Sequence, residues 1–166
     1  NDVTICEGDS IQLFADGGTY YNSLPATHIS SATEQSAYVW PTTTTEYAVI
    51  VSDECTSDTA FVTVNVLPAP NLIAGPDTIV YSNHPVQMYA TGGISYEWSP
   101  ATGLTDAFIP DPISMPDETV QYIITASDES GCKAVDTALV YIIPSCFHYV
   151  TVNAFSPNGD GVNDRF

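Results

Sequence analysis

Basic residues are almost absent from this chain. Among its 166 residues Lys133 and Arg165 are the only lysine and arginine, against 20 acidic residues, and the formal net charge is −18. So few cations cannot neutralise phosphates, which excludes ordinary nucleic-acid binding and argues against adsorption to anionic lipid. The acidic surface favours solubility and mutual repulsion between molecules, with divalent-cation binding as the alternative.

Long apolar stretches are missing as well. No run of about 18 apolar residues occurs, so the sequence predicts no membrane-spanning helix. No window keeps the 3.6-residue apolar period of a long amphipathic helix. Residues 1–4 lack the basic and apolar regions of a signal peptide. Because a strand-like pattern begins at once, we expect the chain to be a fragment or a processed form.

Catalytic motifs are also lacking. His28, His84 and His148 lie at expected turns or in the terminal segment without a nucleophile motif nearby, and no G-x-S-x-G motif occurs. Acidic pairs such as Asp53-Glu54 are typical of solvated loop ends. We therefore expect no catalytic residue and no enzyme.

What the sequence does contain is turn residues and strand formers. It has 12 Pro and ten Gly, which favour short strands joined by turns. Ile11 and Leu13 alternate with Gln12, and Val62, Val64 and Val66 alternate with polar neighbours, a pattern typical of half-buried strands.

An internal repeat sets the expected architecture. A shift of 75 residues aligns Gly17-Gly18 with Gly92-Gly93, Pro25-Ala26-Thr27 with Pro100-Ala101-Thr102, and Tyr47 with Tyr122. After a short insertion, Cys55 aligns with Cys132, and Asp58-Thr59-Ala60 with Asp136-Thr137-Ala138. So many matches in order establish a tandem duplication.

The predicted fold class is all-β, with two tandem antiparallel β-sandwich domains of immunoglobulin type. Repeat 1 spans residues 1–67 and repeat 2 spans residues 71–144. Between them, residues 68–70 form a Pro-rich linker that is stiff and extended. The two domains are therefore expected to form a rod. Residues 145–166 form an extended C-terminal segment.

Four cysteines in so acidic a chain suggest an oxidising, extracellular setting. Cys6 lies in the first expected strand and Cys55 just before the last strand of repeat 1, which predicts a Cys6–Cys55 disulfide. Tyr81 takes the place of Cys6 in repeat 2, so Cys146 becomes the expected partner of Cys132. Thiolate metal binding is the rival reading, but no C-x-x-C spacing occurs.

Three motifs point to a known group of proteins. Cys6-Glu7-Gly8-Asp9, Tyr-x-Trp-Ser-Pro at residues 96–100, and Thr-Glu-Tyr before a Val-rich strand resemble the PKD-like and immunoglobulin-like repeats of Bacteroidota surface proteins. The resemblance covers residues 1–144. Ser23 departs from it by standing where repeat 2 has Trp98, and Trp40 is a candidate to compensate in the core of repeat 1.

The C-terminal stretch carries a more specific resemblance. Residues 152–166, VNAFSPNGDGVNDRF, resemble the opening of the gliding-motility-associated C-terminal domain, a type B sorting signal of the type IX secretion system. The family's domain continues well beyond this motif. The resemblance implies export across the outer membrane by the secretion machinery, then attachment to or release from the cell surface.

Asp followed by Ser or Thr and an apolar residue resembles the Bacteroidota O-glycosylation sequon. This pattern occurs four times and marks Ser10, Thr59, Thr78 and Thr137. The alternative is that Asp-Thr simply begins a strand, with Thr chosen for its β propensity. We expect glycosylation at one or more of these sites.

One stretch is a candidate metal site. Residues 158–164 alternate oxygen-bearing side chains with Gly, and the candidate calcium ligands are Asn158, Asp160, Asn163 and Asp164. The stretch lacks the terminal Glu of an EF-hand, and an Asx-type turn is the favoured alternative.

Aromatic residues offer a last candidate surface. A sugar-stacking surface could be formed by Tyr20, Tyr21, Tyr38, Trp40, Tyr96 and Trp98. The alternative is that a strand Trp such as Trp98 fills the core, and this is what we expect.

The leading hypothesis is a non-catalytic structural or adhesive stalk at the cell surface. Its expected partners are neighbouring repeats or copies of itself in a fibre, the secretion machinery and surface polysaccharide. The alternative is a carbohydrate- or protein-binding accessory module of a secreted hydrolase.

Overall fold

The structure, a computed structural model, describes residues 2–143, and this part of the chain is all-β. The strands of repeat 1 are β1 (Val3–Cys6), β2 (Ile11–Phe14), β3 (Tyr20–Leu24), β4 (Ser36–Val39), β5 (Thr45–Ser52) and β6 (Ser57–Leu67). Those of repeat 2 are β7 (Ile73–Ala74), β8 (Thr78–Tyr81), β9 (Val86–Gln87), β10 (Ala90–Thr91), β11 (Ser95–Ser99), β12 (Ile113–Ser114), β13 (Val120–Ser127) and β14 (Lys133–Ile143). Residues 2–143 contain no helix that could cross a membrane.

Each repeat is a β-sandwich with one four-stranded sheet. Its order is β1-β6-β5-β3 in repeat 1 and β8-β14-β13-β11 in repeat 2. The opposing layer consists of β2 and β4 in repeat 1, and of the pairs β7–β10 and β9–β12 in repeat 2. All pairs are antiparallel, as predicted, except β1–β6 and β8–β14, which are parallel. The parallel pairs arise because a first and a last strand are joined through the whole sandwich and not by a tight turn.

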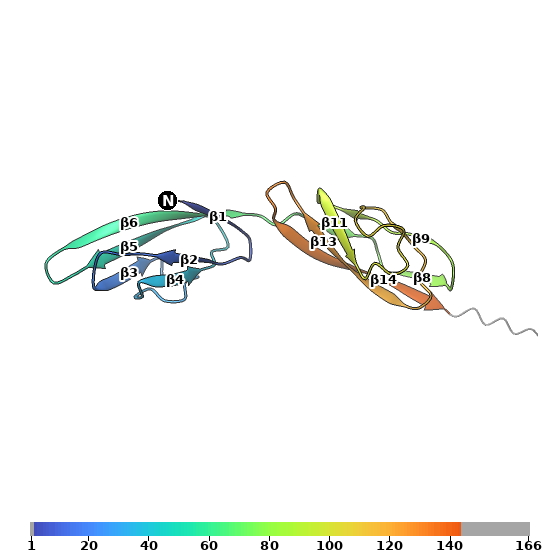
Figure 1. The fold of residues 1–166 in the computed structure, drawn as a ribbon, viewed down its shortest axis with the longest axis horizontal. Coiled ribbons are helices and arrows are strands. Elements are labelled where there is room, and N and C mark those ends of the chain that lie inside the picture. Colours follow the sequence, from blue (N-terminus) through green and yellow to red (C-terminus); the bar gives the residue numbers. More distant parts are fainter. Residues whose placement is uncertain (1, 144–166) are drawn as a thin grey trace, which may run out of the picture.

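The two sandwiches lie end to end and form a rod (Figure 1). The β5–β6 hairpin lies at the outer end of repeat 1, whereas the β13–β14 hairpin of repeat 2 lies at the junction (Figure 1). Pro68 and Pro70 lie between β6 and β7, where proline restricts both itself and the preceding residue to extended conformations.

The duplication is visible in matched local structure. Leu24–Pro25 and Ser99–Pro100 are both cis peptide bonds. The Tyr21 hydroxyl donates a hydrogen bond to the Gly18 carbonyl over 2.8 Å, and the Tyr96 hydroxyl donates to the Gly93 carbonyl over the same distance. The offset of 75 residues therefore holds from β1 to β5.

The last strand of each repeat follows a different offset from the one that the sequence alignment gave. Tyr47 on β5 lies opposite Val62, and its counterpart Tyr122 lies opposite Ala138. The offset in β6 and β14 is thus 76 residues, so the Asp-Thr-Ala match is out of register by two. Ala60, and not Asp58, takes the place of Asp136, because each lies opposite the matching residue of the neighbouring strand, Val49 or Ile124.

The two cores differ in completeness. Repeat 2 buries a cluster of nine residues that includes Trp98 and Tyr122, whereas the buried cluster of repeat 1 consists of Ile5, Val39, Tyr47 and Val64. Trp98 is 2 % exposed, which confirms that it fills the core. Trp40 is 42 % exposed, so it does not compensate for Ser23 in repeat 1.

Candidate functional site

A disulfide joins the two sandwiches at their junction. Cys6 at the end of β1 is bonded to Cys132 in the β13–β14 hairpin, with their Cα atoms 5.5 Å apart. The hairpin is closed by Asp128, whose carboxylate accepts the backbone N–H groups of Ser130 and Cys132. The sulfur of Cys132 is thereby held toward repeat 1, and its residue is fully buried.

The predicted pairings Cys6–Cys55 and Cys132–Cys146 are therefore wrong. Cys6 lies opposite Leu67 at one end of β6, and Cys55 lies just before the other end of this 11-residue strand. Eleven residues of strand span roughly 35 Å, whereas the Cα atoms of a disulfide lie within about 7 Å. Cys55 is an exposed, free thiol among the described residues, and Cys146 lies outside them.

The linker and the disulfide together make two covalent connections between the sandwiches. The peptide chain passes from β6 through Pro68 and Pro70 into β7, and the Cys6–Cys132 bond runs beside it. A hinge with one connection can bend and rotate, whereas two connections at separate points restrict both motions. The junction is therefore built to keep the repeats aligned.

Beyond the linker, β7 closes one side of repeat 2. The Gly75 N–H donates to the Tyr89 carbonyl over 2.8 Å, and the Ala74 N–H donates to Oδ2 of Asp136 over 2.8 Å. The bond from the Ala74 N–H, together with one from the Thr137 N–H, holds the pKa of the Asp136 carboxyl below its usual value. The side chains of Leu72 and Ala74 pack against the buried cluster of repeat 2.

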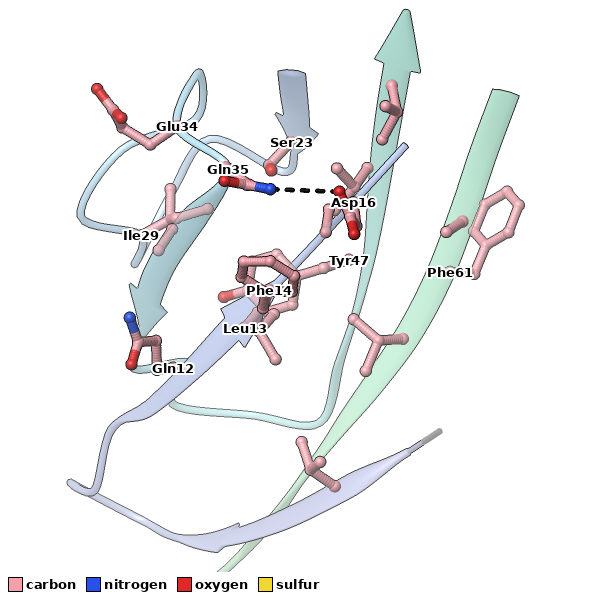
Figure 2. A pocket seen from close by; sticks show the side chains of 17 residues that line it. Gln12, Leu13, Phe14, Asp16, Ser23, Ile29, Glu34, Gln35, Tyr47 and Phe61 are labelled. Carbon is pink, nitrogen blue, oxygen red and sulfur yellow. Dashed lines mark hydrogen bonds between the residues drawn. The ribbon is translucent and has the colours of Figure 1, made fainter. Parts of the chain in front are cut away.

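Repeat 1 has an open pocket between its sheets instead. Its volume is about 410 Å³, and Leu13, Ser23, Tyr47, Val51 and Ala60 are among its lining residues. Figure 2 shows Ser23 and Tyr47 at this pocket, with the Gln35 amide hydrogen-bonded to the Asp16 carboxylate over 3.5 Å. The pocket exists in part because Ser23 replaces the indole that Trp98 places in repeat 2. Sequence comparison found that substitution, but it did not reveal the open side.

The tyrosines at the centre of both cores have structural roles. The Tyr122 hydroxyl donates to the Thr102 carbonyl over 2.9 Å and lies 2.9 Å from the Ser114 hydroxyl. Burial raises the pKa of the Tyr122 and Tyr47 phenols. Neither phenol is poised to lose a proton near neutral pH.

The predicted glycosylation sites lie in different environments. Ser10, Thr59 and Thr137 are exposed, and Thr78 is half-buried with its hydroxyl directed to the Pro76 carbonyl at 3.2 Å. In both Asp-Thr pairs of the last strands, the aspartate accepts the N–H of the following Thr. Occupancy of these sites stays a prediction.

Other predicted chemistry is not assembled within residues 2–143. His28 and His84 are both exposed, and this part of the chain contains no cluster of three or more His, Cys, Asp or Glu side chains suited to a metal. The candidate calcium ligands Asn158, Asp160, Asn163 and Asp164 lie outside the described residues, as does His148. Melting the protein with and without a chelator remains the test of that calcium prediction.

The candidate aromatic surface is divided between surface and core. Tyr20, Tyr38 and Trp40 are exposed, Tyr21 and Tyr96 are half-buried, and Trp98 is buried. Trp98 lies in the core, where its Nε1–H donates to the Ile109 carbonyl over 2.9 Å. The six aromatic residues therefore do not form one sugar-stacking surface.

Among the comparisons with known proteins, only the one with solved structures finds similar proteins. No protein-family model matches the chain, and no curated protein matches it. The insect immune protein hemolin is similar over 86 % of this chain and 45 % of its own, with 15 % identity and a TM-score of 0.44. Drosophila OTK extracellular domains 3–5 match over 85 % of this chain and 59 % of theirs, with 10 % identity and a TM-score of 0.40.

The titin domains z1z2 in complex with telethonin match over 86 % of this chain and 92 % of theirs, with 13 % identity and a TM-score of 0.33. The chain thus spans less than half the length of the hemolin structure. The sheet orders and the buried central residues show that residues 2–143 form two tandem, immunoglobulin-like β-sandwiches.

Proposed function

We propose that this chain is a non-catalytic, extracellular spacer: a stiff, rod-like pair of repeats in a bacterial surface protein with a structural or adhesive role. The observation that carries the proposal is the Cys6–Cys132 disulfide. This covalent bond joins the two repeats beside the Pro-containing linker, and it restricts their bending and rotation relative to each other. Neither cysteine belongs to the buried hydrophobic cluster of its repeat.

The edge strands support a mechanical role. In repeat 1, β1 runs parallel to β6 with Val3 opposite Val64 and Cys6 opposite Leu67. In repeat 2, β8 runs parallel to β14 in the same way. When the two ends of a repeat are pulled apart, its first and last strands are drawn in opposite directions along their axes. The hydrogen bonds between these parallel strands are then loaded in shear. All of these bonds must then break together, which resists unfolding better than breaking them one by one.

Small-angle X-ray scattering tests the rod. We expect the oxidised chain to give one elongated shape that matches the end-to-end arrangement. The double variant Cys6→Ser/Cys132→Ser should give a broader range of dimensions and a shorter mean, because the linker alone permits bending. Equal scattering from both proteins would show that the disulfide does not align the repeats.

The proposal also covers the compartment of the protein and the route of its export. An internal disulfide fits an oxidising setting, and residues 152–166 resemble the opening of a type IX sorting domain. In a host with this system, we expect the protein to be digested by protease on intact cells. It should stay protected in a strain that lacks the system. Surface exposure in both strains would contradict the export route.

A binding module within a secreted hydrolase is the second candidate, which the open pocket of repeat 1 favours. Its lining combines apolar side chains such as Leu13 and Tyr47 with polar ones that include Asp16, Glu34 and Gln35, which could serve as hydrogen-bonding partners of a sugar. Saturable binding of oligosaccharides, mapped to this pocket by nuclear magnetic resonance, would favour the accessory module over the spacer.

Surface glycosylation completes the proposal. Ser10, Thr59 and Thr137 are exposed, so a transferase can reach their hydroxyl groups. The intact mass of protein purified from its native host should exceed the mass of the polypeptide, and peptide mapping should place the excess on these residues. An unmodified mass would end this part of the proposal.

A further inference from the structure

Repeat 1 has open space where repeat 2 holds the indole of Trp98. In repeat 2 this indole belongs to the same buried cluster as Met88, Tyr122 and Ala138. The counterparts of these three residues in repeat 1 all line the pocket of about 410 Å³, and they are Leu13, Tyr47 and Val62. Ser23, in the place of Trp98, lines the same pocket (Figure 2). Repeat 1 thus keeps the walls of the indole site and lacks the indole.

The space at Ser23 does not depend on strand β7. In repeat 2 the side chains of Leu72 and Ala74 pack against the same buried cluster that contains Trp98. The indole and the side chains around β7 therefore occupy separate places, and both places are filled at once. A strand in the position of β7 would leave the place of the indole empty in repeat 1, because that space results from serine in place of tryptophan.

The loop beside the pocket follows the same path in both repeats. The Ser23 N–H donates to the Ala32 carbonyl over 2.7 Å, and the Trp98 N–H donates to the Ala107 carbonyl over 2.8 Å. Both the donors and the acceptors of these two bonds are 75 positions apart. The offset of the duplication therefore holds through this loop, and its residues can be matched one by one.

This match identifies an acceptor for a ring N–H. In repeat 2 the Nε1–H of Trp98 donates to the Ile109 carbonyl over 2.9 Å. The counterpart of Ile109 is Glu34, which lines the pocket of repeat 1. Within residues 2–143 no backbone N–H donates to the Glu34 carbonyl. This carbonyl can therefore accept a hydrogen bond from a ligand at the place of the indole.

The pocket also offers an aromatic contact. In repeat 2 the rings of Trp98 and Tyr122 meet edge to face, with their centroids 6.2 Å apart and an interplanar angle of 77°. Tyr47 holds the position of Tyr122 and is 1 % exposed, so its ring is fixed by packing. A cavity left by a large side chain in an apolar core can bind an aromatic molecule of matching size, and edge-to-face contact favours a planar ring.

We propose that repeat 1 binds a small, planar heteroaromatic molecule of indole size at Ser23. The ring N–H of the ligand donates to the Glu34 carbonyl, and its ring meets Tyr47 edge to face. The exposed carboxylates of Asp16 and Glu34 line the same pocket, so neutral and cationic ligands are favoured over anionic ones. This inference goes beyond the proposed spacer and does not rest on it.

Titration of the whole isotope-labelled chain with tryptamine, followed by nuclear magnetic resonance, tests the proposal. We expect saturable shifts in the signals of Leu13, Tyr47 and Val62, and none at Trp98 or Tyr122, because repeat 2 fills the site itself.

Two pairs of probes test the chemistry of the site. Indoleacetate carries a carboxylate where tryptamine carries an ammonium group, and it should bind about tenfold more weakly because the pocket is acidic. N-methylindole should bind about tenfold more weakly than indole, because the Glu34 carbonyl loses its hydrogen-bond donor.

Three variants of the chain locate the ligand. Ser23→Trp should abolish the shifts by placing an indole of the chain itself in the site. Asn22→Trp is the matched control: Asn22 is exposed and points to the opposite face of the sheet, so this variant should bind tryptamine like the wild type. Ser23→Leu fills the same space with a smaller side chain, should also abolish the shifts, and replaces Ser23→Trp if that variant does not fold.

Absence of saturable shifts at millimolar tryptamine in the folded chain would overturn the proposal. Binding that persists in a folded Ser23→Trp or Ser23→Leu variant would overturn it as well, because the ligand would then lie elsewhere. Equal binding of indole and N-methylindole would contradict the role of the Glu34 carbonyl. None of these results bears on the rod, whose dimensions are measured separately by scattering, so failure of the inference and failure of the spacer are distinguishable.

Discussion

Cys6 and Cys132 are 126 positions apart in the chain and are covalently bonded across the junction of two sandwiches. Each cysteine lies outside the buried cluster of its own repeat. The bond therefore fixes the relation between two domains, and neither sandwich depends on it to hold its sheets together.

The pairing can be checked by chemistry alone. Alkylation without reductant should label Cys55, whose residue is exposed, and leave Cys6 and Cys132 unlabelled. Proteolysis of the unreduced protein should give a peptide pair linked through Cys6 and Cys132. Detection of a Cys6–Cys55 pair by mass spectrometry would contradict the structure.

Exchanging the residues at the Trp98 position should affect the two repeats in opposite directions. Trp98→Ser should lower the free energy of unfolding of repeat 2 by about 3–5 kcal/mol, since it removes a buried indole and leaves a cavity. Ser23→Trp should stabilise repeat 1 by roughly 1 kcal/mol by filling part of the pocket. Urea denaturation followed by circular dichroism measures both changes. Destabilisation by Ser23→Trp would show that the pocket cannot accept the ring.

The Asp136 carboxylate should stabilise repeat 2 in a pH-dependent way. Asp136→Ala removes the acceptor for the Ala74 and Thr137 N–H groups. We expect this change to lower the free energy of unfolding by about 1 kcal/mol at neutral pH. This is a small value for hydrogen bonds to a charged group, because the site is partly solvated. The pKa is lowered in the folded state, so the contribution is complete above the unfolded value of about 3.9. It is lost as the pH falls through the folded pKa.

The measurement is the difference in unfolding free energy between the wild type and Asp136→Ala at several pH values from 6 to 3. Taking the difference cancels the general effect of protonating a highly acidic chain. A difference that stays constant over this range would contradict a role for the ionised carboxylate.

Two glycines allow a matched test of the close approach at β7. Gly17→Ala and Gly92→Ala should both cost about 1–2 kcal/mol, because both residues have positive φ. Gly92→Ala should cost about 1–3 kcal/mol more, since its Cβ would displace the Asn71 carbonyl. Equal costs in thermal unfolding would mean that the segment before β7 moves aside freely.

Much of the molecule follows from local sequence. Alternation at Ile11 to Leu13 and Val62 to Val66 is a property of a strand with one buried face, so the all-β class is readable without coordinates. The duplication is equally visible, because matched turns such as Gly17-Gly18 and Gly92-Gly93 keep their spacing. The same comparison identified Ser23 in the place of Trp98, and a buried Trp98 is what a strand indole in a sandwich requires.

Tertiary structure decided which residues meet. The sequence alignment matched Cys55 with Cys132 and Asp58 with Asp136. In the structure the hairpin loop is one residue longer in repeat 2, so the residues that correspond to Cys132 and Asp136 are Thr56 and Ala60. Order along the chain suggested Cys6–Cys55, whereas a disulfide depends on distance in space, and the two lie at opposite ends of β6. The parallel edge strands and the disulfide-bonded junction depend on long-range packing, which no local pattern of residues encodes.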